Sequence, residues 1–231
     1  MRTPQAKDWD HFWKKNLPAR KLTRQAGRPG DSSRISWSKK RILSVIKPYV
    51  IAGKNILDAG CGSGFFAHYF QGQGLNAWAL DYSDSALAAT KGLTQGRVKL
   101  IKSDLAVEGL KEKLNLGIQF DVIFSDGLLE HFLFKSQGII LKNFKGLLYS
   151  QGTLITFVPN RFSPWEIIRP CYMPGIEERP FILKELIGLH SQQGLEIIKA
   201  GGINVFPFRL SPENWFGSNF GMLLFVVARK K

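Results

Sequence analysis

Residues 55–66, which read NILDAGCGSGFF, constrain the fold more than any other segment of the chain. The apolar pair before the glycines is typical of the end of a short buried strand, and the aromatic pair after them predicts the start of a helix. Between these elements lies a turn in which bare backbone can approach a ligand closely; its glycines are Gly60, Gly62 and Gly64. A strand, a glycine turn and a helix form the first half of a βαβ unit, where doubly wound α/β proteins bind ligands. Taken alone, the turn is also compatible with a tight strand-to-helix connection that binds nothing.

Strands and helices alternate along the rest of the chain. Strands are predicted at 55–59, 77–80, 98–101, 120–124, 152–158, 195–198 and 222–228. Helices are predicted at 8–17, from Ser36 or Ser38 to about Pro48, at 65–73, from Ser83 through Ala89, at 136–149 and at 182–193. Apolar strands separated by helical stretches predict a parallel sheet covered on both faces. The expected fold is therefore α/β, a doubly wound, seven-stranded, mostly parallel sheet, and the closing strand–loop–strand run indicates that its last strand is antiparallel.

The length of 231 residues and the mass of 26.0 kDa suit one globular domain with an arm or an insertion. The sequence contains no apolar run long enough to cross a membrane, and residues 1–8 lack the apolar core of a signal peptide. The two cysteines, Cys61 and Cys171, are too few for a disulfide framework and stand in no metal-ligand spacing. We therefore expect a reduced, cytoplasmic protein without a transmembrane segment or a metal site.

The net charge of +14 is concentrated before the glycine turn. Residues 1–54 hold 14 Lys and Arg against 3 Asp and Glu, whereas residues 55–231 hold 18 against 15. This division predicts a basic, aromatic N-terminal arm at 1–54 and a nearly neutral body at 55–231. Such an arm favours an acidic partner, for example nucleic acid or an anionic membrane surface; a solvated arm that binds nothing is the alternative.

Acidic residues stand at the ends of the first three strands. Asp81 ends the second strand, where a carboxylate can accept hydrogen bonds from both hydroxyls of a ribose. Asp58 stands just before the first glycine, where it would repel a pyrophosphate but would suit a ligand with an ammonium group. Asp104 follows the third strand, where it can accept a hydrogen bond from an adenine amino group. These positions favour an adenosyl amino acid over a dinucleotide.

With these motifs the sequence resembles a known family, the class I S-adenosylmethionine-dependent methyltransferases. The resemblance is carried by residues 57–64 (LDAGCGSG), 80–83 (LDYS), 103–105 (SDL) and 120–131 (FDVIFSDGLLEH). It is strong over about 55–158 and weak over the final strands. Within the family the chain is most similar to the small-molecule branch that includes the ubiquinone- and menaquinone-biosynthesis methyltransferases. The resemblance implies a Rossmann-like fold, S-adenosylmethionine as cofactor and S-adenosylhomocysteine as product.

The resemblance also implies roles for individual residues. The cofactor-binding residues would be Asp58, Gly60, Cys61, Gly62, Gly64, Asp81, Tyr82, Ser83, Asp104, Leu105, Ser125, Asp126 and Gly127. His131 is the candidate general base for an O- or N-methylation, with an orienting or packing role as the alternative. Because a sulfonium is an activated methyl donor, alignment can supply much of the rate and a base is not obligatory.

The candidates for substrate binding lie outside these motifs. The arm carries an aromatic stripe at helical spacing, Trp9, Phe12 and Trp13, which is typical of a helix packed on the body. An insertion at about 160–180 and a loop at 206–220 carry further large apolar residues: Trp165, Tyr172, Met173, Phe206, Phe208, Trp215 and Phe216. Such loops beside a cofactor predict a lid over a small, apolar or planar substrate, and the cationic arm favours an acidic one. Ordinary loop packing is the alternative.

Three other functions stay open from the sequence. An RNA methyltransferase would use the basic arm as its electrostatic footprint, although the turn at 125–128 lacks the Asn/Asp-Pro-Pro-Tyr/Phe signature of many enzymes that methylate base amino groups. A protein that binds S-adenosylmethionine without catalysis would act as a regulator or partner. A nicotinamide-dependent oxidoreductase would use the same glycine turn. The sequence favours methyl transfer to an O, N or C atom of a small molecule.

Overall fold

The computed structural model describes residues 5–16, 35–172, 177–205 and 212–231. The predicted basic linker at 18–33, together with Met173, Phe206 and Phe208, lies outside the described residues, as does the side chain of Tyr172. Within the described ranges, no helix has both the length and the apolar character that a bilayer-spanning helix requires.

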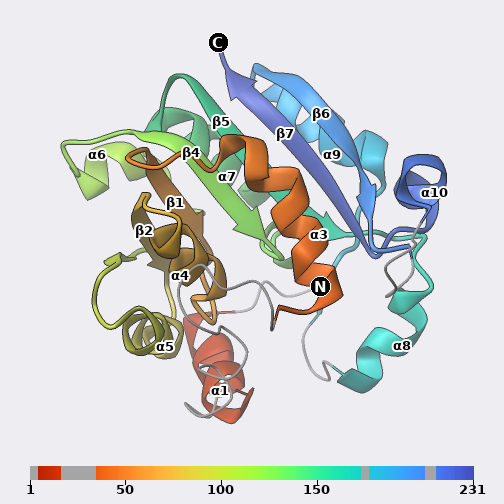
Figure 1. Cartoon of the computed structure of the whole chain (residues 1–231), viewed down its shortest axis with the longest axis horizontal. Coiled ribbons are helices and arrows are strands. Elements are labelled where there is room, and N and C mark those ends of the chain that lie inside the picture. Colours follow the sequence, from red (N-terminus) through yellow and green to blue (C-terminus); the bar gives the residue numbers. More distant parts are fainter. Residues whose placement is uncertain (1–4, 17–34, 173–176, 206–211) are drawn as a thin grey trace.

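One sheet forms the centre of the molecule (Figure 1). Its strands are β1 (Asn55–Ala59), β2 (Asn76–Asp81), β3 (Lys99–Lys102), β4 (Phe120–Asp126), β5 (Leu148–Pro159), β6 (Leu195–Ile203) and β7 (Leu223–Lys230). They lie in the order β3-β2-β1-β4-β5-β7-β6; β7 runs antiparallel to both of its neighbours, and the other pairings are parallel. The predicted doubly wound, seven-stranded sheet with an antiparallel last strand is confirmed. The strand order reverses between β1 and β4, which is where ligands bind in such sheets.

Helices cover both faces of the sheet. They are α1 (Ala6–Asn16), α3 (Trp37–Ile46), α4 (Phe65–Gly72), α5 (Asp84–Thr94), α6 (Leu110–Leu114), α7 (Phe134–Leu147), α8 (Trp165–Tyr172), α9 (Leu183–Gln192) and α10 (Glu213–Phe220), with short 3-10 turns at Lys47–Tyr49 and Leu129–His131. One apolar core joins α3, α4 and α5 to the sheet, and another joins α6, α7 and α9 to the opposite face. Neighbouring strand residues divide between the cores, as Ile56 and Leu57 do. Burial on both faces explains why these strands are continuously apolar.

The predicted helix starts at Ser36 and Ser83 are confirmed. The Ser36 hydroxyl accepts a hydrogen bond from the Lys39 N–H at 3.4 Å, and the Ser83 hydroxyl accepts one from the Ala86 N–H at 3.2 Å. The predicted helix at 136–149 ends earlier, at Leu147, because β5 begins at the next residue.

The prediction of a loop throughout 206–220 is wrong, because residues 213–220 form α10. This helix contacts β6, but its large side chains stay outside the core: Trp215 is 81% exposed and Phe220 is 48% exposed. Since no apolar stripe faces the core, the sequence lacks the periodic signal by which a helix is recognised. The insertion at 160–180, where no period was apparent, likewise contains α8.

Candidate active site

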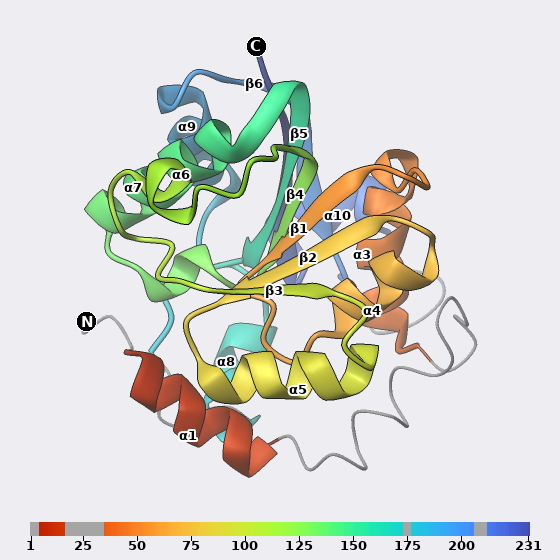
Figure 2. The same ribbon diagram turned by 90° about the vertical axis from the view of Figure 1, so that its left-hand side faces the viewer.

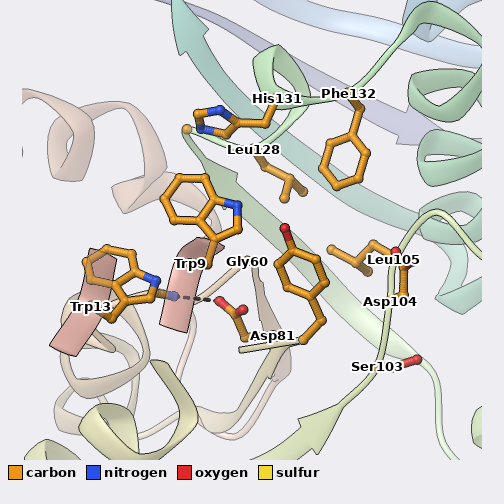
Figure 3. Close-up of a pocket in the computed structure, with 13 residues that line it drawn as sticks. Trp9, Trp13, Gly60, Asp81, Ser103, Asp104, Leu105, Leu128, His131 and Phe132 are labelled. Atoms are coloured by element: carbon orange, nitrogen blue, oxygen red, sulfur yellow. Dashed lines mark hydrogen bonds between the residues drawn. The ribbon is translucent and has the colours of Figure 1, made fainter. Parts of the chain in front are cut away.

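The carboxyl ends of β1, β2, β3 and β4 meet at a cavity (Figure 3). Its walls are Trp9, Trp13, Gly60, Gly62, Asp81, Tyr82, Ser103, Asp104, Leu105, Gly127, Leu128, His131 and Phe132. A larger cavity, which is open to the solvent, lies beside it. The two cavities share the walls Trp9, Trp13, Gly60, Gly62, Gly127 and His131. We call them the inner cavity and the outer cavity.

Asp81 is fixed by backbone hydrogen bonds at the end of β2. Its Oδ2 accepts from the Gly62 N–H at 3.0 Å, and its Oδ1 accepts from the Ser83 N–H at 3.0 Å. Burial raises the pKa of Asp81, while the backbone N–H groups of Ser83 and Gly62 act in the opposite direction. Since a carboxylate has about four acceptor positions, both oxygens can accept a further hydrogen bond from a ligand. The hydrogen bond to Gly62 appears as the dashed line in Figure 3.

Tyr82, Asp104 and Leu105 also line the inner cavity. Burial raises the pKa of the Tyr82 hydroxyl, and the charges of Asp81 and Asp104 act in the same direction. The Asp104 Oδ1 accepts a hydrogen bond from the Ala106 N–H at 2.8 Å, so this exposed acid also stabilises the turn after β3. The Leu105 carbonyl accepts a hydrogen bond from the Asn143 side chain at 2.9 Å, which fixes this stretch of backbone.

Asp58 lies at the base of the outer cavity and is 2% exposed. Its Oδ2 accepts a hydrogen bond from the Ala67 N–H at 2.9 Å, so it caps the first turn of α4. Burial raises the pKa of Asp58 to about 8, and the charges of Asp126 and Asp81 act in the same direction against Lys39. Because burial disfavours the charged form of Asp58, a cation beside it would bind favourably. The ammonium group of an adenosyl amino acid is such a cation.

We predict that Asp58→Asn makes the cofactor-free protein more stable near neutral pH. The unfolded chain releases the Asp58 proton near pH 3.8, whereas the folded chain keeps it to about pH 8. This residue therefore lowers the free energy of unfolding progressively as the pH rises between those values. Asn keeps an acceptor for the Ala67 N–H but does not titrate, so stability should fall less steeply with pH in the variant. Urea denaturation between pH 3.8 and about 8, with Asp84→Asn as the control, measures how the free energy of unfolding depends on pH. An equal pH dependence in parent and variant would refute the prediction.

His131 lies where the two cavities meet. Its Nδ1 is 3.4 Å from the Glu177 carbonyl oxygen. Because a carbonyl only accepts, Nδ1 carries the hydrogen of this bond and Nε2 keeps its lone pair. Burial lowers the pKa of His131 to about 4, against the hydrogen bond to Glu177. The ring is therefore neutral near pH 7 and is a weak base.

The aromatic stripe of α1 covers this junction. The Trp9 ring packs edge-on against the His131 ring at 4.8 Å between centroids and stacks with Trp13 at 6.0 Å. A Cβ atom on Gly62 would lie 2.6 Å from the Trp13 ring, so Trp13 can occupy this position only over a glycine. Figure 3 shows Trp9, Trp13, Asp81 and His131 around the same space. The predicted packing of this stripe is thus against the site itself, which the helical spacing alone could not specify.

Asp10 joins α1 to α5, which lies beside it (Figure 2). The Asp10 Oδ1 accepts hydrogen bonds from the Ser83 hydroxyl at 2.6 Å and from the Ser85 N–H at 3.0 Å. These bonds place Trp9 and Trp13 over the cavities.

We predict that Asp10→Ala weakens binding of S-adenosylhomocysteine about tenfold, equivalent to about 1.4 kcal/mol. Without the two hydrogen bonds to α5, α1 should cover the cavities for less of the time. Calorimetric titration measures the affinity, and a red shift in tryptophan emission reports exposure of the indoles. Lys15→Ala, an exposed change on the same helix, is the control. A red shift with unchanged affinity would show that α1 does not enclose the ligand.

The structure brings most of the predicted cofactor residues to the cavities but leaves three away from their walls. Ser83 is buried beneath α1, Ser125 is buried within β4, and Gly64 lies against Thr90 of α5. Cys61 and Asp126 line only the outer cavity, where the Cys61 sulfur is 3.4 Å from the Thr90 hydroxyl.

Several wall residues were missed by sequence reasoning. Phe132 lines the inner cavity, and Lys39, Glu130, Arg169 and Glu178 line the outer one. Glu130 lies inside the motif at 120–131, which was its only signal in the sequence. Lys39 and Arg169 come from distant helices with no motif.

The residues fit an adenosyl amino acid. The inner cavity offers a buried ribose-binding acid with unused acceptor positions, and the outer cavity offers a buried acid suited to an ammonium group. When bound, S-adenosylmethionine would supply an activated methyl group on its sulfonium.

Comparisons with known proteins agree with this fit. Residues 57–154 match the family described as Methyltransferase domain. A TehB-like SAM-dependent methyltransferase from Corynebacterium glutamicum is similar at 20% identity and a TM-score of 0.62, with 98% of each chain covered. Magnesium protoporphyrin IX methyltransferase from Synechocystis, solved with bound S-adenosylhomocysteine, is similar at 15% identity and a TM-score of 0.66, over 96% of this chain and 97% of that one.

A SAM-dependent methyltransferase from Thermotoga maritima, described as a possible histamine N-methyltransferase, is similar at 16% identity and a TM-score of 0.65, over 96% of this chain and 98% of that one. At these identities the solved structures show a common fold. The methyltransferase-domain match runs from β1 into β5, through the glycine turn and the ends of β2, β3 and β4. Residues 57–154 thus form a methyltransferase domain, the chain shares the fold of solved S-adenosylmethionine-dependent methyltransferases, and S-adenosylmethionine is its cofactor.

Proposed function

We propose that this enzyme methylates a small molecule bound in the outer cavity while the adenosyl part of the cofactor occupies the inner one. The observation that carries this proposal is the contact between the cavities at Gly60, Gly62, Gly127 and His131. A methyl group held at this boundary would face directly into the outer cavity.

The cofactor residues take the roles that the family resemblance implies. Asp81 binds the ribose hydroxyls, Tyr82 and Asp104 bind the adenine, and Asp58 lies by the ammonium group. The remaining contacts come from the glycine turn and from Gly127. His131 orients and encloses the reacting groups, because a neutral ring of low basicity is poorly suited to removing a proton.

The small size of the acceptor is supported by what surrounds the outer cavity. The arm contributes Trp9, Phe12 and Trp13 from α1, and the insertion at 160–180 contributes Trp165 and Arg169 from α8. We therefore propose that the arm and the insertion are parts of one acceptor pocket on the catalytic domain at 55–231. Two elements folded over the cofactor site suit a compact molecule better than a nucleic-acid strand, which needs an open, positively charged groove.

The fate of a radiolabelled methyl group tests this proposal. The purified enzyme is incubated with labelled S-adenosylmethionine and either a metabolite extract, total RNA or total protein. Label should enter the small-molecule fraction and should be lost with Asp81→Asn. Label in RNA instead would indicate an RNA methyltransferase that binds its substrate through the basic arm. No transfer to any fraction would favour a protein that binds the cofactor without catalysis.

A further inference from the structure

The walls of the outer cavity carry more acidic than basic groups. Asp58, Asp126, Glu130 and Glu178 face it, against Lys39 and Arg169. Lys39 lies near Asp58 and Asp126, whose charges favour its protonated form against the effect of burial. Arg169 binds Glu166 at 3.2 Å and Glu178 at 3.4 Å. Both cations are therefore already engaged by acids other than Glu130.

Glu130 has a buried carboxyl oxygen without a partner. The side chain is 1% exposed, and among the described residues its Oε2 has no hydrogen bond. Its Oε1 lies 3.9 Å from the His131 Nε2, beyond hydrogen-bonding distance. Burial raises the pKa of Glu130 well above its usual range, and the charges of Glu178, Asp126 and Glu166 act in the same direction. A buried polar atom without a partner is costly, so a ligand that satisfies it binds favourably.

The backbone around Glu130 is held in place by the segment that follows α8. The Arg179 N–H donates to the Glu130 carbonyl oxygen at 2.9 Å, and the Glu177 carbonyl accepts from the neighbouring His131 ring. Glu130 therefore has a fixed backbone and a side chain that faces the cavity.

Aromatic rings form much of the remaining wall. Phe12, Trp13, Phe65, Phe66 and Trp165 line the outer cavity. The Lys39 ammonium already lies 3.6 Å from the centre of the Phe65 ring, which shows that rings in this cavity accept a cation. Buried acids and aromatic faces together favour a ligand that is both cationic and apolar.

We propose that the acceptor is an apolar or aromatic amine, and that Glu130 binds its ammonium group and takes its proton. This inference rests on the proposed transfer to a small molecule. It replaces the acidic acceptor that the charge of the arm suggested.

The proton balance is simple. The ammonium nitrogen gives one proton to the Glu130 carboxylate and thereby gains a lone pair. That lone pair forms the new nitrogen–carbon bond as the carbon–sulfur bond breaks and leaves its electron pair on sulfur. The methylated ammonium departs with its positive charge, and Glu130 returns its proton to solvent through the open outer cavity.

Calorimetry with three compounds of matched shape tests the assignment: phenylpropylamine, phenylpropanol and phenylpropanoate, each added to the enzyme saturated with S-adenosylhomocysteine. The amine should bind at least about tenfold more tightly than the alcohol, and the carboxylate should bind most weakly. Glu130→Gln should lose this preference because its affinity for the amine falls, while its affinities for the alcohol and for S-adenosylhomocysteine stay unchanged. Glu196→Gln, which removes an exposed charge from β6, should behave as the parent does.

A second readout separates proton transfer from binding. With the amine as acceptor, Glu130→Gln should lower kcat about 100-fold, in the range of lost general-base catalysis. Tighter binding of the carboxylate, no binding of any of the three compounds, or an unchanged amine preference in Glu130→Gln would overturn the proposal. If Glu130→Gln still transfers label to small molecules, only the role of Glu130 is overturned. If the parent enzyme labels no small molecule, the proposed function itself is overturned.

Discussion

Asp81→Asn is expected to weaken binding of S-adenosylhomocysteine about 100-fold. A hydrogen bond to a charged group contributes about 1.5–3 kcal/mol, and a ribose offers two hydroxyls to this carboxylate. Asn keeps one acceptor oxygen but places an amide donor where the other carboxylate oxygen was, so at least one ribose bond is lost together with the negative charge. A loss of about 2.7 kcal/mol corresponds to this factor.

Calorimetric titration of the parent and the variant measures the effect. Asp84→Asn is the matched control, because Asp84 lies three residues farther along the chain and forms an exposed ion pair with Lys102 at 2.7 Å. It should leave the affinity within about twofold. Near-equal affinities of Asp81→Asn and the parent would mean that the adenosyl group does not contact the end of β2.

Gly64→Ala is expected to lower the free energy of unfolding by about 3 kcal/mol. Gly64 has a φ of +75°, and a Cβ atom there would lie 2.6 Å from the Thr90 Oγ1 and 2.7 Å from the Thr90 Cα. The left-handed conformation costs a non-glycine residue about 1–2 kcal/mol, and crowding of a packed interior adds about 1–3 kcal/mol. The Thr90 Cα belongs to the backbone of α5 and cannot rotate away, so α4 and α5 must separate.

Gly53→Ala provides the matched control. Gly53 has a similar φ of +80°, but a Cβ atom there would have no neighbour within 4 Å. The free energy of unfolding of this variant should fall only by the cost of the left-handed conformation, about 1 kcal/mol. Urea denaturation with equal m-values gives both numbers. Equal losses in the two variants would show that contact between the glycine turn and α5 contributes nothing to stability.

The parts of the fold that the sequence predicted are those whose signal is local. The strands β1 to β5 follow from continuous apolar runs, and the Ser36 and Ser83 caps follow from side chains that bond to backbone three residues away. The acids at 58, 81 and 104 were placed at one edge of the sheet because parallel strands end on the same side. The structure brings all of them to the two cavities.

The rest depends on contacts between distant segments. The spacing of Trp9 and Trp13 predicts a packed helix. It does not predict the hydrogen bonds between Asp10 and the start of α5, more than 70 residues along the chain. Lys39 lies in an ordinary amphipathic helix, and only the tertiary fold places it near Asp58 and Asp126. Glu130 has the sequence pattern of a helix-terminus charge, yet the segment after α8 encloses it.

A crystal structure of the enzyme with S-adenosylhomocysteine would show how the cofactor is divided between the two cavities. We expect density for the adenosine in the inner cavity, with the ribose against Asp81 and the sulfur at the boundary lined by Gly127 and His131. The outer cavity should remain open for an acceptor beside the sulfur. Density for the adenosine outside the inner cavity, or a sulfur that faces away from the outer one, would contradict this assignment of the two cavities.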